Sequence, residues 1–352
     1  MRAETVDLPL GSSLVYYAPQ DVRLEPMKSL PVVGKGEVLI KIEACAICGT
    51  DIKSYFSGNP RIKPPMTMGH EFAGMIVEVD AEATGYQVGQ RVTMATSIGC
   101  GECYYCRKGQ TNLCRSAEAM GFHYPGAMAP YIKIPAKAVR QNHLVDIGDL
   151  DPQVAALSEP MSCAINNISR FPQEQYDSAL IIGLGPLGIL HAVTLREKGV
   201  RHICCVEFPG KRLDLMQQLG FVTVTPDEID SCYQELSQGD GFDLVVVTAP
   251  HNPTQGKAPM YARKGGHVAF FASLPVGDEM LSINSRTIHY NELIIYGTSD
   301  STVKHVAEAV KILQANPMRF KSLITQVMPY RDFQQAMVEI KAGNAIKVVL
   351  VP

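Results

Sequence analysis

The second half of the chain alternates short, almost wholly apolar runs with amphipathic segments. The apolar runs cover residues 180–182, 200–207, 241–248, 266–271 and 293–296. Short runs of this kind are typical of strands buried on both faces. Because helical patterns separate them, the sequence predicts an α/β fold with a parallel, doubly wound sheet.

The first 150 residues follow a different pattern, in which short strand-like runs are separated by glycine turns. Strands are expected over residues 38–44, 75–79 and 88–92. Many short strands with glycine punctuation predict a small barrel-like β domain. At 352 residues the chain also exceeds one ordinary core, so two domains are expected.

A glycine turn joins the first apolar run of the second half to a helical pattern that continues through Leu195. The turn has the spacing G-x-G-x-x-G. The first glycine permits a tight turn, the second lets backbone N–H groups approach phosphates, and the third lets helix and strand pack closely. The turn therefore predicts a dinucleotide site whose candidate contacts are Gly183, Gly185, Pro186, Leu187 and Gly188.

An acidic residue strengthens this prediction. Glu207 ends the second apolar run, nineteen residues after Gly188. A carboxylate there can accept hydrogen bonds from ribose hydroxyls and would repel a 2′-phosphate, which favours NAD over NADP. Arg212 follows closely and softens that repulsion, and a solvated strand-end carboxylate is the alternative interpretation. Thr248, at the end of the next apolar run, is a further candidate contact to the cofactor.

Four cysteines gather within fifteen residues, at Cys100, Cys103, Cys106 and Cys114. Short loops of this spacing let four thiolates converge tetrahedrally on one zinc with no open position, which predicts a structural site. An iron–sulfur cluster is the main alternative, although its common spacings differ. Four unrelated free thiols are the other alternative.

Composition and charge argue against nucleic-acid binding, a membrane span and secretion. The formal net charge is −3, and no run of Lys or Arg occurs, so we expect neither a nucleic-acid partner nor a nucleic-acid-binding zinc module. The longest uncharged stretch, residues 178–195, holds three glycines and a proline and is not expected to span a membrane. The first ten residues lack a secretory apolar core, so the ten cysteines favour a reducing, cytoplasmic location. Cys204, Cys205 and Cys232 are expected to have no partner.

Five ordered motifs give the chain a family resemblance. They are Cys48-Gly-Thr-Asp, Gly69-His-Glu, the four-cysteine loop, Glu159-Pro and the glycine turn. With them the chain resembles the zinc-containing medium-chain alcohol dehydrogenases, in particular the polyol (sorbitol-type) and threonine dehydrogenase branch. The resemblance implies a GroES-like β-barrel catalytic domain over residues 1–157 and 297–352 and a Rossmann domain over residues 158–296.

The resemblance also implies two zinc ions per chain, one catalytic and one structural. The catalytic zinc would be held by Cys48 and His70, with Glu71 and Glu159 as carboxylates of which either could be a direct ligand. Cys163, one helical turn beyond Glu159, is a weaker alternative ligand. Thr50 would accept the substrate proton, and Asp51 would orient His70.

The implied reaction is the zinc-dependent, NAD-linked interconversion of a secondary alcohol and its ketone. The substrate would be a small polyol, a sugar alcohol or its phosphate, with an amino alcohol of the L-threonine type as the alternative. Two departures argue against sorbitol: Lys53 stands where many relatives have a relay histidine, and Asp300 stands where sorbitol-type enzymes have an arginine. Asp300 is expected to cap the following helix. A homodimer or homotetramer is implied, paired through the edge of the sheet around residues 270–295.

Overall fold

The computed structural model describes residues 10–170, 176–237 and 239–352. The chain divides into two compact units. One comprises Met1–Glu159 with Thr302–Pro352, and the other comprises Pro160–Ser301. The C-terminal segment therefore belongs to the same unit as the N-terminal segment, and the second unit is inserted between them in sequence.

The inserted unit contains one parallel sheet of six strands in the order β13-β12-β11-β14-β15-β16. The strands β11 and β14 are buried along their whole length, as expected of strands covered on both faces. The strands are β11 (Ser178–Ile182), β12 (His202–Val206), β13 (Val222–Val224), β14 (Phe242–Val247), β15 (Ala262–Phe270) and β16 (Ile294–Gly297). The predicted doubly wound sheet is confirmed.

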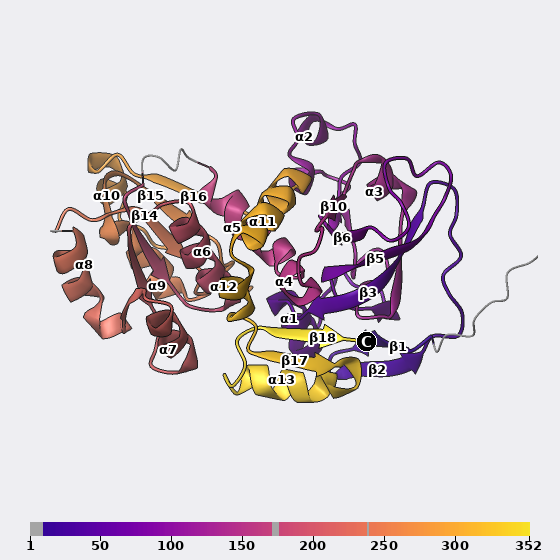
Figure 1. The fold of residues 1–352 in the computed structure, drawn as a ribbon. Coiled ribbons are helices and arrows are strands. Elements are labelled where there is room, and N and C mark those ends of the chain that lie inside the picture. The colour runs from indigo at the N-terminus through magenta and orange to yellow at the C-terminus, as the bar shows by residue number, and fades with distance from the viewer. Residues whose placement is uncertain (1–9, 171–175, 238) are drawn as a thin grey trace, which may run out of the picture. The chain divides into compact units, whose positions relative to one another are not determined.

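Helices connect these strands and surround the sheet (Figure 1). They are α6 (Pro186–Glu197), α7 (Lys211–Gln218), α8 (Ile229–Ser237), α9 (Asn252–Lys257) and α10 (Ser285–Tyr290). The side chains of Leu180, Phe242 and Val268 are completely buried in the core between them. Cys204 on β12 and Cys232 on α8 are in bonding contact through their Sγ atoms, so the expectation that neither has a partner is wrong.

The other unit is built mainly from antiparallel strands. A seven-stranded sheet has the order β10-β6-β5-β3-β18-β17, with β9 pairing with β3, and a second sheet has the order β2-β1-β4. The strands are β1 (Ser12–Ala18), β2 (Asp21–Pro26), β3 (Val38–Ala46), β4 (Met66–Thr67), β5 (Glu71–Val79), β6 (Arg91–Met94), β7 (Ser97–Ile98), β8 (Glu118–Ala119), β9 (Tyr131–Ile134), β10 (Leu144–Asp146), β17 (Gln326–Pro329) and β18 (Val348–Val351). This is the predicted β-rich unit, although the strand pairings of the described residues do not close into a ring.

The helices of this unit are mostly short, although one has 13 residues. They are α1 (Gly49–Ser57), α2 (Tyr104–Arg107), α3 (Ala136–Arg140), α4 (Pro152–Ala155), α11 (Val303–Ala315), α12 (Pro317–Lys321) and α13 (Phe333–Lys341), and α5 (Ser158–Ile168) begins at the unit boundary. The core unites both ends of the chain, because Phe72 and Phe333 are buried in one cluster. The Tyr330 hydroxyl donates to the carbonyls of Ala127 and Ala129 at 3.0 and 3.2 Å.

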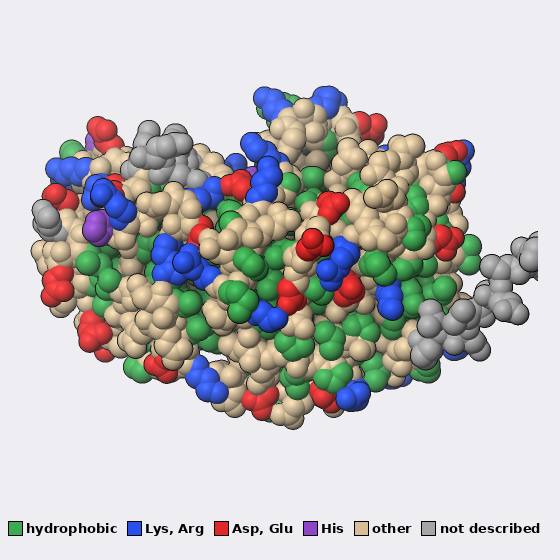
Figure 2. Space-filling view, in the orientation of Figure 1, with side chains coloured by type: hydrophobic (Ala, Val, Ile, Leu, Met, Phe, Trp, Pro, Cys, Tyr) green, Lys and Arg blue, Asp and Glu red, His purple; other side chains and the backbone are tan. Residues whose placement is uncertain are grey.

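The surface agrees with the sequence-based view of charge. Figure 2 shows acidic and basic side chains interspersed on the visible face, without a large area of one sign. Within the described residues, no helix combines the length and the apolar character needed to cross a membrane.

Candidate active site

Cys48 stands where β3 gives way to α1. It is the N-cap of α1: its Sγ accepts from the Thr50 N–H at 3.4 Å, and its own N–H donates to Asp51 Oδ2 at 3.0 Å. This reciprocal capping holds the sulfur at the start of the helix. Burial, together with the nearby charges of Glu71, Asp51 and Glu159, raises the pKa of the Cys48 thiol well above its usual value. A cation would be needed to hold the thiolate here.

His70 and Glu71 come at the start of β5, directly after a glycine that no other residue could replace. Gly69 has a φ of +92°, and a Cβ there would lie 2.7 Å from both Cys45 Sγ and Met128 Cγ. The two side chains that follow are buried, at 7% and 0% exposure. The ligand atoms of Cys48, His70 and Glu71 lie within 4.8 Å of one another, so the structure brings these three predicted residues together.

This donor set fits a zinc ion. Among the residues that the structure describes, His70 Nδ1 and Glu71 Oε1 are buried and find no hydrogen-bond partner. Asp51 Oδ1 faces His70 Nδ1 at 3.9 Å, which is too long for a hydrogen bond. Buried polar atoms are normally satisfied, and sulfur, imidazole and carboxylate are the ligands that zinc prefers. The cluster therefore has both the vacant donors and the chemistry for the predicted catalytic metal.

Glu159 lies in the first turn of α5 and is 7% exposed. The preceding residue fixes the start of the helix, because Ser158 Oγ lies 2.9 Å from Thr93 Oγ1 and donates to the Ala155 carbonyl at 2.6 Å. Glu159 is not in the 4.8 Å group with Cys48. The Glu159 carboxylate nevertheless acts on His70 electrostatically. Burial, the largest influence, lowers the pKa of His70, but the negative charges of Asp51, Glu159 and Glu71 together raise it above its usual value.

Lys347 is a residue of this site to which the sequence analysis assigned no role. It is 3% exposed, its Nζ is paired with Glu71 Oε2, and it donates to the Ile47 carbonyl at 3.0 Å. Burial alone would lower the pKa of Lys347, but Glu71 offsets this and raises it. One carboxylate oxygen of Glu71 is thus occupied by the lysine, while Oε1 stays vacant. The available signal was a lone lysine inside the apolar run of residues 345–351.

The structure places Thr50 on α1, and it shows that Asp300 does not have its predicted capping role. Thr50 lies half-buried on α1, and its carbonyl accepts from Ser54 Oγ at 2.8 Å. Lys53, on the same helix, is exposed. The expectation that Asp300 caps the next helix is wrong, because Thr302 is the N-cap of α11. Asp300 instead has a φ of +62°, and its Oδ1 accepts from the Ser301 N–H at 2.6 Å.

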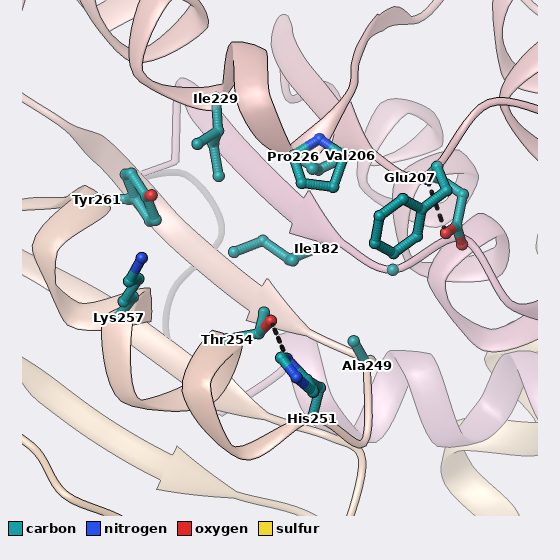
Figure 3. Close-up of a pocket in the computed structure, with 12 residues that line it drawn as sticks. Ile182, Val206, Glu207, Pro226, Ile229, Ala249, His251, Thr254, Lys257 and Tyr261 are labelled. Atoms are coloured by element: carbon teal, nitrogen blue, oxygen red, sulfur yellow. Dashed lines mark hydrogen bonds between the residues drawn. The ribbon is translucent and has the colours of Figure 1, made fainter.

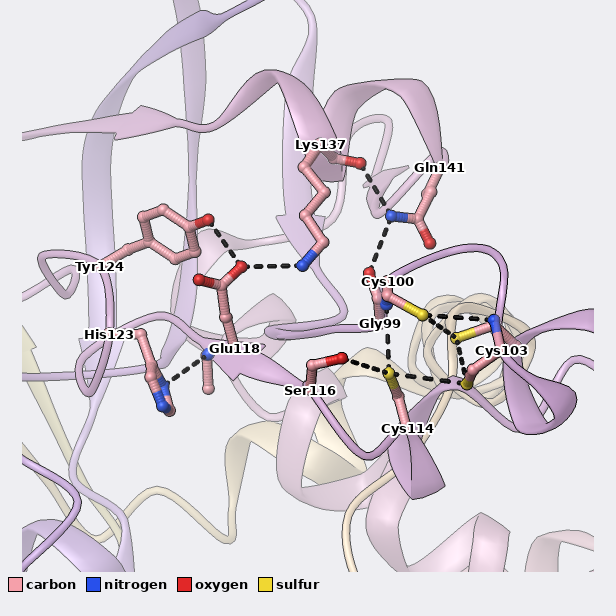
Figure 4. Close-up of polar contacts among 12 residues, drawn as sticks. Gly99, Cys100, Cys103, Cys114, Ser116, Glu118, His123, Tyr124, Lys137 and Gln141 are labelled. Atoms are coloured by element: carbon pink, nitrogen blue, oxygen red, sulfur yellow. Dashed lines mark hydrogen bonds and ion pairs between the residues drawn. The ribbon is translucent and has the colours of Figure 1, made fainter.

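The four cysteines of the loop converge as the spacing predicts (Figure 4). Cys103 Sγ lies 3.6 Å from Cys106 Sγ and 3.8 Å from Cys114 Sγ, and the Cys100–Cys106 separation is 3.9 Å. Four sulfurs at about 2.3 Å from one zinc in a tetrahedron would be about 3.8 Å apart. A hydrogen bond from the Cys106 backbone lowers the pKa of Cys103 to about 6. The residues present therefore fit a closed, four-sulfur zinc site.

The glycine turn has the geometry that a dinucleotide needs. Gly183 has a φ of +96°, open space surrounds the Cβ position of Gly185, and a Cβ on Gly188 would lie 1.9 Å from the Gly183 carbonyl oxygen. Pro186 and Leu187 begin α6, whose N-terminus carries no side-chain cap within the described residues. The N–H groups of its first turn are thus available to an anion. Thr248 contributes by donating to the Gly183 carbonyl at 2.6 Å.

Glu207 follows β12 and turns its carboxylate toward the glycine turn. Its Oε2 accepts from the Leu184 N–H at 2.8 Å, and its Oε1 accepts from the Phe208 N–H at 2.9 Å. Arg212 Nη1 lies 3.8 Å from Oε2. The two residues predicted to influence the choice between NAD and NADP are therefore neighbours.

A cavity of about 420 Å³ opens beside Glu207 (Figure 3). Ile182, Val206 and Ile229 form an apolar part of its wall, and Figure 3 places Lys257 and Tyr261 across from Glu207. The sequence analysis missed His251, Thr254, Lys257 and Tyr261, which also line it. They follow β14, and ligands bind at the carboxyl ends of parallel strands, so the position of that strand could have indicated them.

Comparison with known proteins shows that the chain is similar to dehydrogenases. Residues 34–143 match the model of the alcohol dehydrogenase GroES-like domain, and residues 153–351 match that of the glucose dehydrogenase C-terminus. An L-threonine 3-dehydrogenase from Caldanaerobacter subterraneus subsp. tengcongensis is 31% identical over 335 residues, which cover 92% of this chain and 94% of that protein. One from Bacillus velezensis is 29% identical over 92% of this chain and 93% of that protein.

Solved structures are also similar. A protein from Sinorhizobium meliloti 1021, described as a zinc-binding dehydrogenase bound to NADP, is 26% identical with a TM-score of 0.88, over 97% of this chain and 99% of that one. The 2R,3R-butanediol dehydrogenase from Bacillus subtilis shares the fold at 22% identity, with a TM-score of 0.87 and the same coverage.

Proposed function

The chain belongs to the zinc-containing medium-chain alcohol dehydrogenase family of oxidoreductases that act on CH–OH groups, and from this premise we propose its substrate class, cofactor and site residues. The proposed reaction is the NAD-linked interconversion of a secondary alcohol with its ketone. The alcohol is a polyol, a sugar alcohol or a sugar-alcohol phosphate. A second candidate is L-threonine, because several similar curated proteins are named L-threonine 3-dehydrogenase.

The proposed catalytic zinc is held by Cys48, His70 and a carboxylate from Glu71 or Glu159. When bound, zinc would acidify the substrate hydroxyl and NAD would accept the hydride. Thr50 accepts the hydroxyl proton from its position on α1, two residues after the Cys48 cap. Lys347 neutralises Glu71 so that this buried carboxylate can stand beside the thiolate. Lys53 is exposed and takes no part in this proton path.

The proposed cofactor site is the glycine turn with Glu207 and the cavity next to it. The vacant N–H groups at the start of α6 receive the pyrophosphate, and Glu207 receives the adenosine ribose. The fixed negative charge of Glu207 favours NAD over NADP. A second zinc in the four-cysteine loop is structural, because four sulfurs leave no position for substrate.

The protein is further proposed to be a cytoplasmic homodimer or homotetramer. Among the described residues, the eight cysteines other than Cys204 and Cys232 form no disulfide, which suits a reducing compartment. The assembly would pair edge strands β16 of two copies.

The cluster of Cys48 with the buried His70 and Glu71 carries this proposal, because within the described residues His70 Nδ1 and Glu71 Oε1 have no hydrogen-bond partner. The test is a panel of sorbitol, ribitol, galactitol 1-phosphate and L-threonine with NAD and NADP, read by reduced-nicotinamide absorbance. We expect turnover of at least one member, preferentially with NAD. Cys48→Ala and His70→Ala should each lower kcat by about 10³-fold or more and remove one zinc per chain. Cys163→Ser is the control and should change neither; unchanged activity in Cys48→Ala would reject the proposed site.

A further inference from the structure

A chain of ring contacts leads from the candidate zinc ligand to a surface cation. The His70 and Phe122 rings are tilted against each other with centroids 5.5 Å apart. The Arg61 guanidinium carbon lies 4.6 Å from the Phe122 centroid, over the ring. His70 and Phe122 are 7% and 8% exposed, whereas Arg61 is exposed. A positive charge is therefore placed one aromatic ring away from the proposed reaction centre, on the side open to solvent.

The backbone at Arg61 is fixed to the helix that carries Thr50. The Arg61 N–H donates to Asn59 Oδ1 at 3.1 Å, and the buried Ile62 donates to the Asn59 carbonyl at 3.1 Å. Asn59 Nδ2 donates to Ser54 Oγ at 3.3 Å, and Ser54 Oγ donates to the Thr50 carbonyl at 2.8 Å. An exposed side chain on an anchored backbone loses less entropy when it binds a ligand.

The guanidinium edge has no acidic partner. Within residues 10–170, 176–237 and 239–352, no carboxylate pairs with Arg61, although the chain carries more acids than bases. Other arginines of the chain are paired with carboxylates: Arg23, Arg91, Arg201 and Arg263. Stacking on a ring occupies only the planar face of a guanidinium, so its N–H groups at the edge remain able to donate. Their forked geometry matches a carboxylate or a phosphate.

We propose that Arg61 determines substrate specificity by binding an anionic group, a carboxylate or a phosphate ester, on the alcohol that the enzyme oxidises. The inference rests on the proposed function and narrows its substrate class. The two ring contacts separate the imidazole from the guanidinium carbon by at most about 10 Å. A small hydroxy acid or sugar-alcohol phosphate that lies alongside Phe122 can direct its hydroxyl toward His70 and its anion to Arg61. A neutral polyol leaves the Arg61 donors unused.

The experiment compares charged and neutral substrates that share the same reacting carbon. The pairs are galactitol 1-phosphate with galactitol, and L-threonine with L-threonine amide. In Arg61→Met, we expect KM for the charged member of the accepted pair to rise about 10- to 100-fold, with the neutral member unchanged. Arg61→Lys should recover part of the loss, because it restores the charge without the fork. Arg23→Met is the matched control, since Arg23 also stacks on an aromatic ring but is already paired with Asp21.

Binding is also measured by calorimetry on the zinc-containing protein with NADH present, so that the anion site is tested independently of turnover. The charged member should bind the native protein about 10- to 100-fold more tightly than it binds Arg61→Met, while zinc content and NADH affinity stay the same. Equal binding to both proteins, or an equal loss for charged and neutral substrates, overturns the role of Arg61 even where alcohols are oxidised. If no alcohol is oxidised while the binding difference persists, the proposed reaction fails and the anion site stands.

Discussion

Glu207 shows how one side chain can connect the strand end to the glycine turn. Both carboxylate oxygens accept backbone N–H groups, one from Leu184 and one from Phe208, so its charge is held at a fixed place. Arg212 lies 3.8 Å away and would be released if that charge were removed. Glu207→Ala should therefore raise kcat/KM for NADP relative to NAD by about 10- to 100-fold. Steady-state kinetics with both cofactors measure this ratio. The same substitution at Glu235, exposed on α8, should leave it unchanged; a constant ratio in Glu207→Ala would assign cofactor choice elsewhere.

His191 is a residue whose burial makes the nucleotide-binding unit sensitive to acid. It is 0% exposed on α6, and its Nδ1 donates to the Leu187 carbonyl at 2.6 Å. Its Nε2 has no hydrogen-bond partner in the described part of the chain. A proton on Nε2 would be buried and unpaired, so burial lowers the pKa of His191 to about 4 from 6.5. Between these values the unfolded chain binds the proton and the folded chain does not. Stability should therefore fall by about 3 kcal/mol as the pH drops from 6.5 to 4.

Urea unfolding at a series of pH values measures this loss. His191→Gln, which retains a donor for the Leu187 carbonyl, should flatten the profile over that interval. His202→Gln, at an exposed position on β12, should keep the native slope. A steep profile in His191→Gln would attribute the acid sensitivity to other groups.

At the residue scale, the sequence predicted site residues that belong to short motifs. It missed residues that are distant in sequence and approach the site only when the chain folds. Cys48, His70 and Glu71 stand in short motifs, and the structure brings them together. Lys347 meets Glu71 across 276 residues, and no local pattern encodes that distance. Asp300 was assigned a capping role from its residue type, but the left-handed backbone turn at that position moves the helix start to Thr302.

At the element scale, the four-cysteine loop has little apolar packing, so its order would depend on the proposed zinc. It contains only the four-residue helix α2 and a short 3₁₀ turn, and its apolar side chains Tyr104 and Leu113 are 59% and 40% exposed. Cys103→Ser should lower the zinc content from about two to about one per chain and increase hydrogen exchange across residues 100–114. Elemental analysis and exchange mass spectrometry measure both changes. Cys163→Ser should retain both zinc ions; if Cys103→Ser also retains both, the loop does not bind the second zinc.

The burial and length of each strand explain whether the sequence predicted it. β11 and β14 are buried on both faces, so continuous apolar runs identified them. β13 has three residues and only partial burial, which leaves too little pattern to detect. In the other unit, β18 pairs with both β3 and β17, from distant parts of the chain. Strand order there follows from long-range packing, so the sequence predicted a β-rich unit without its sheet order.

At the scale of the whole molecule, the proposed assembly depends on an exposed sheet edge. β16 ends the six-stranded sheet, Ile294 on it is 42% exposed, and Val276, Met280 and Tyr290 nearby in sequence are 97%, 85% and 62% exposed. Ile294→Lys should convert the native assembly into monomers of 38.4 kDa, because a charge on an edge strand opposes pairing. Light scattering after size exclusion measures the mass. Val222→Lys, on the opposite edge strand β13 and 46% exposed, should leave the assembly intact. The reverse result would place the interface at β13.

The central position of β18 sets an order of events during translation. β3 and β5 are made early, but their sheet lacks an interior strand until residues 348–351 have left the ribosome. Glu71 likewise lacks its lysine partner until residue 347 arrives. The continuous unit of residues 160–301 is complete well before then and can fold on the nascent chain. Zinc capture at Cys48 should therefore follow the emergence of residue 347: ribosome-bound chains stalled before this residue should bind NAD while failing to retain the proposed catalytic zinc.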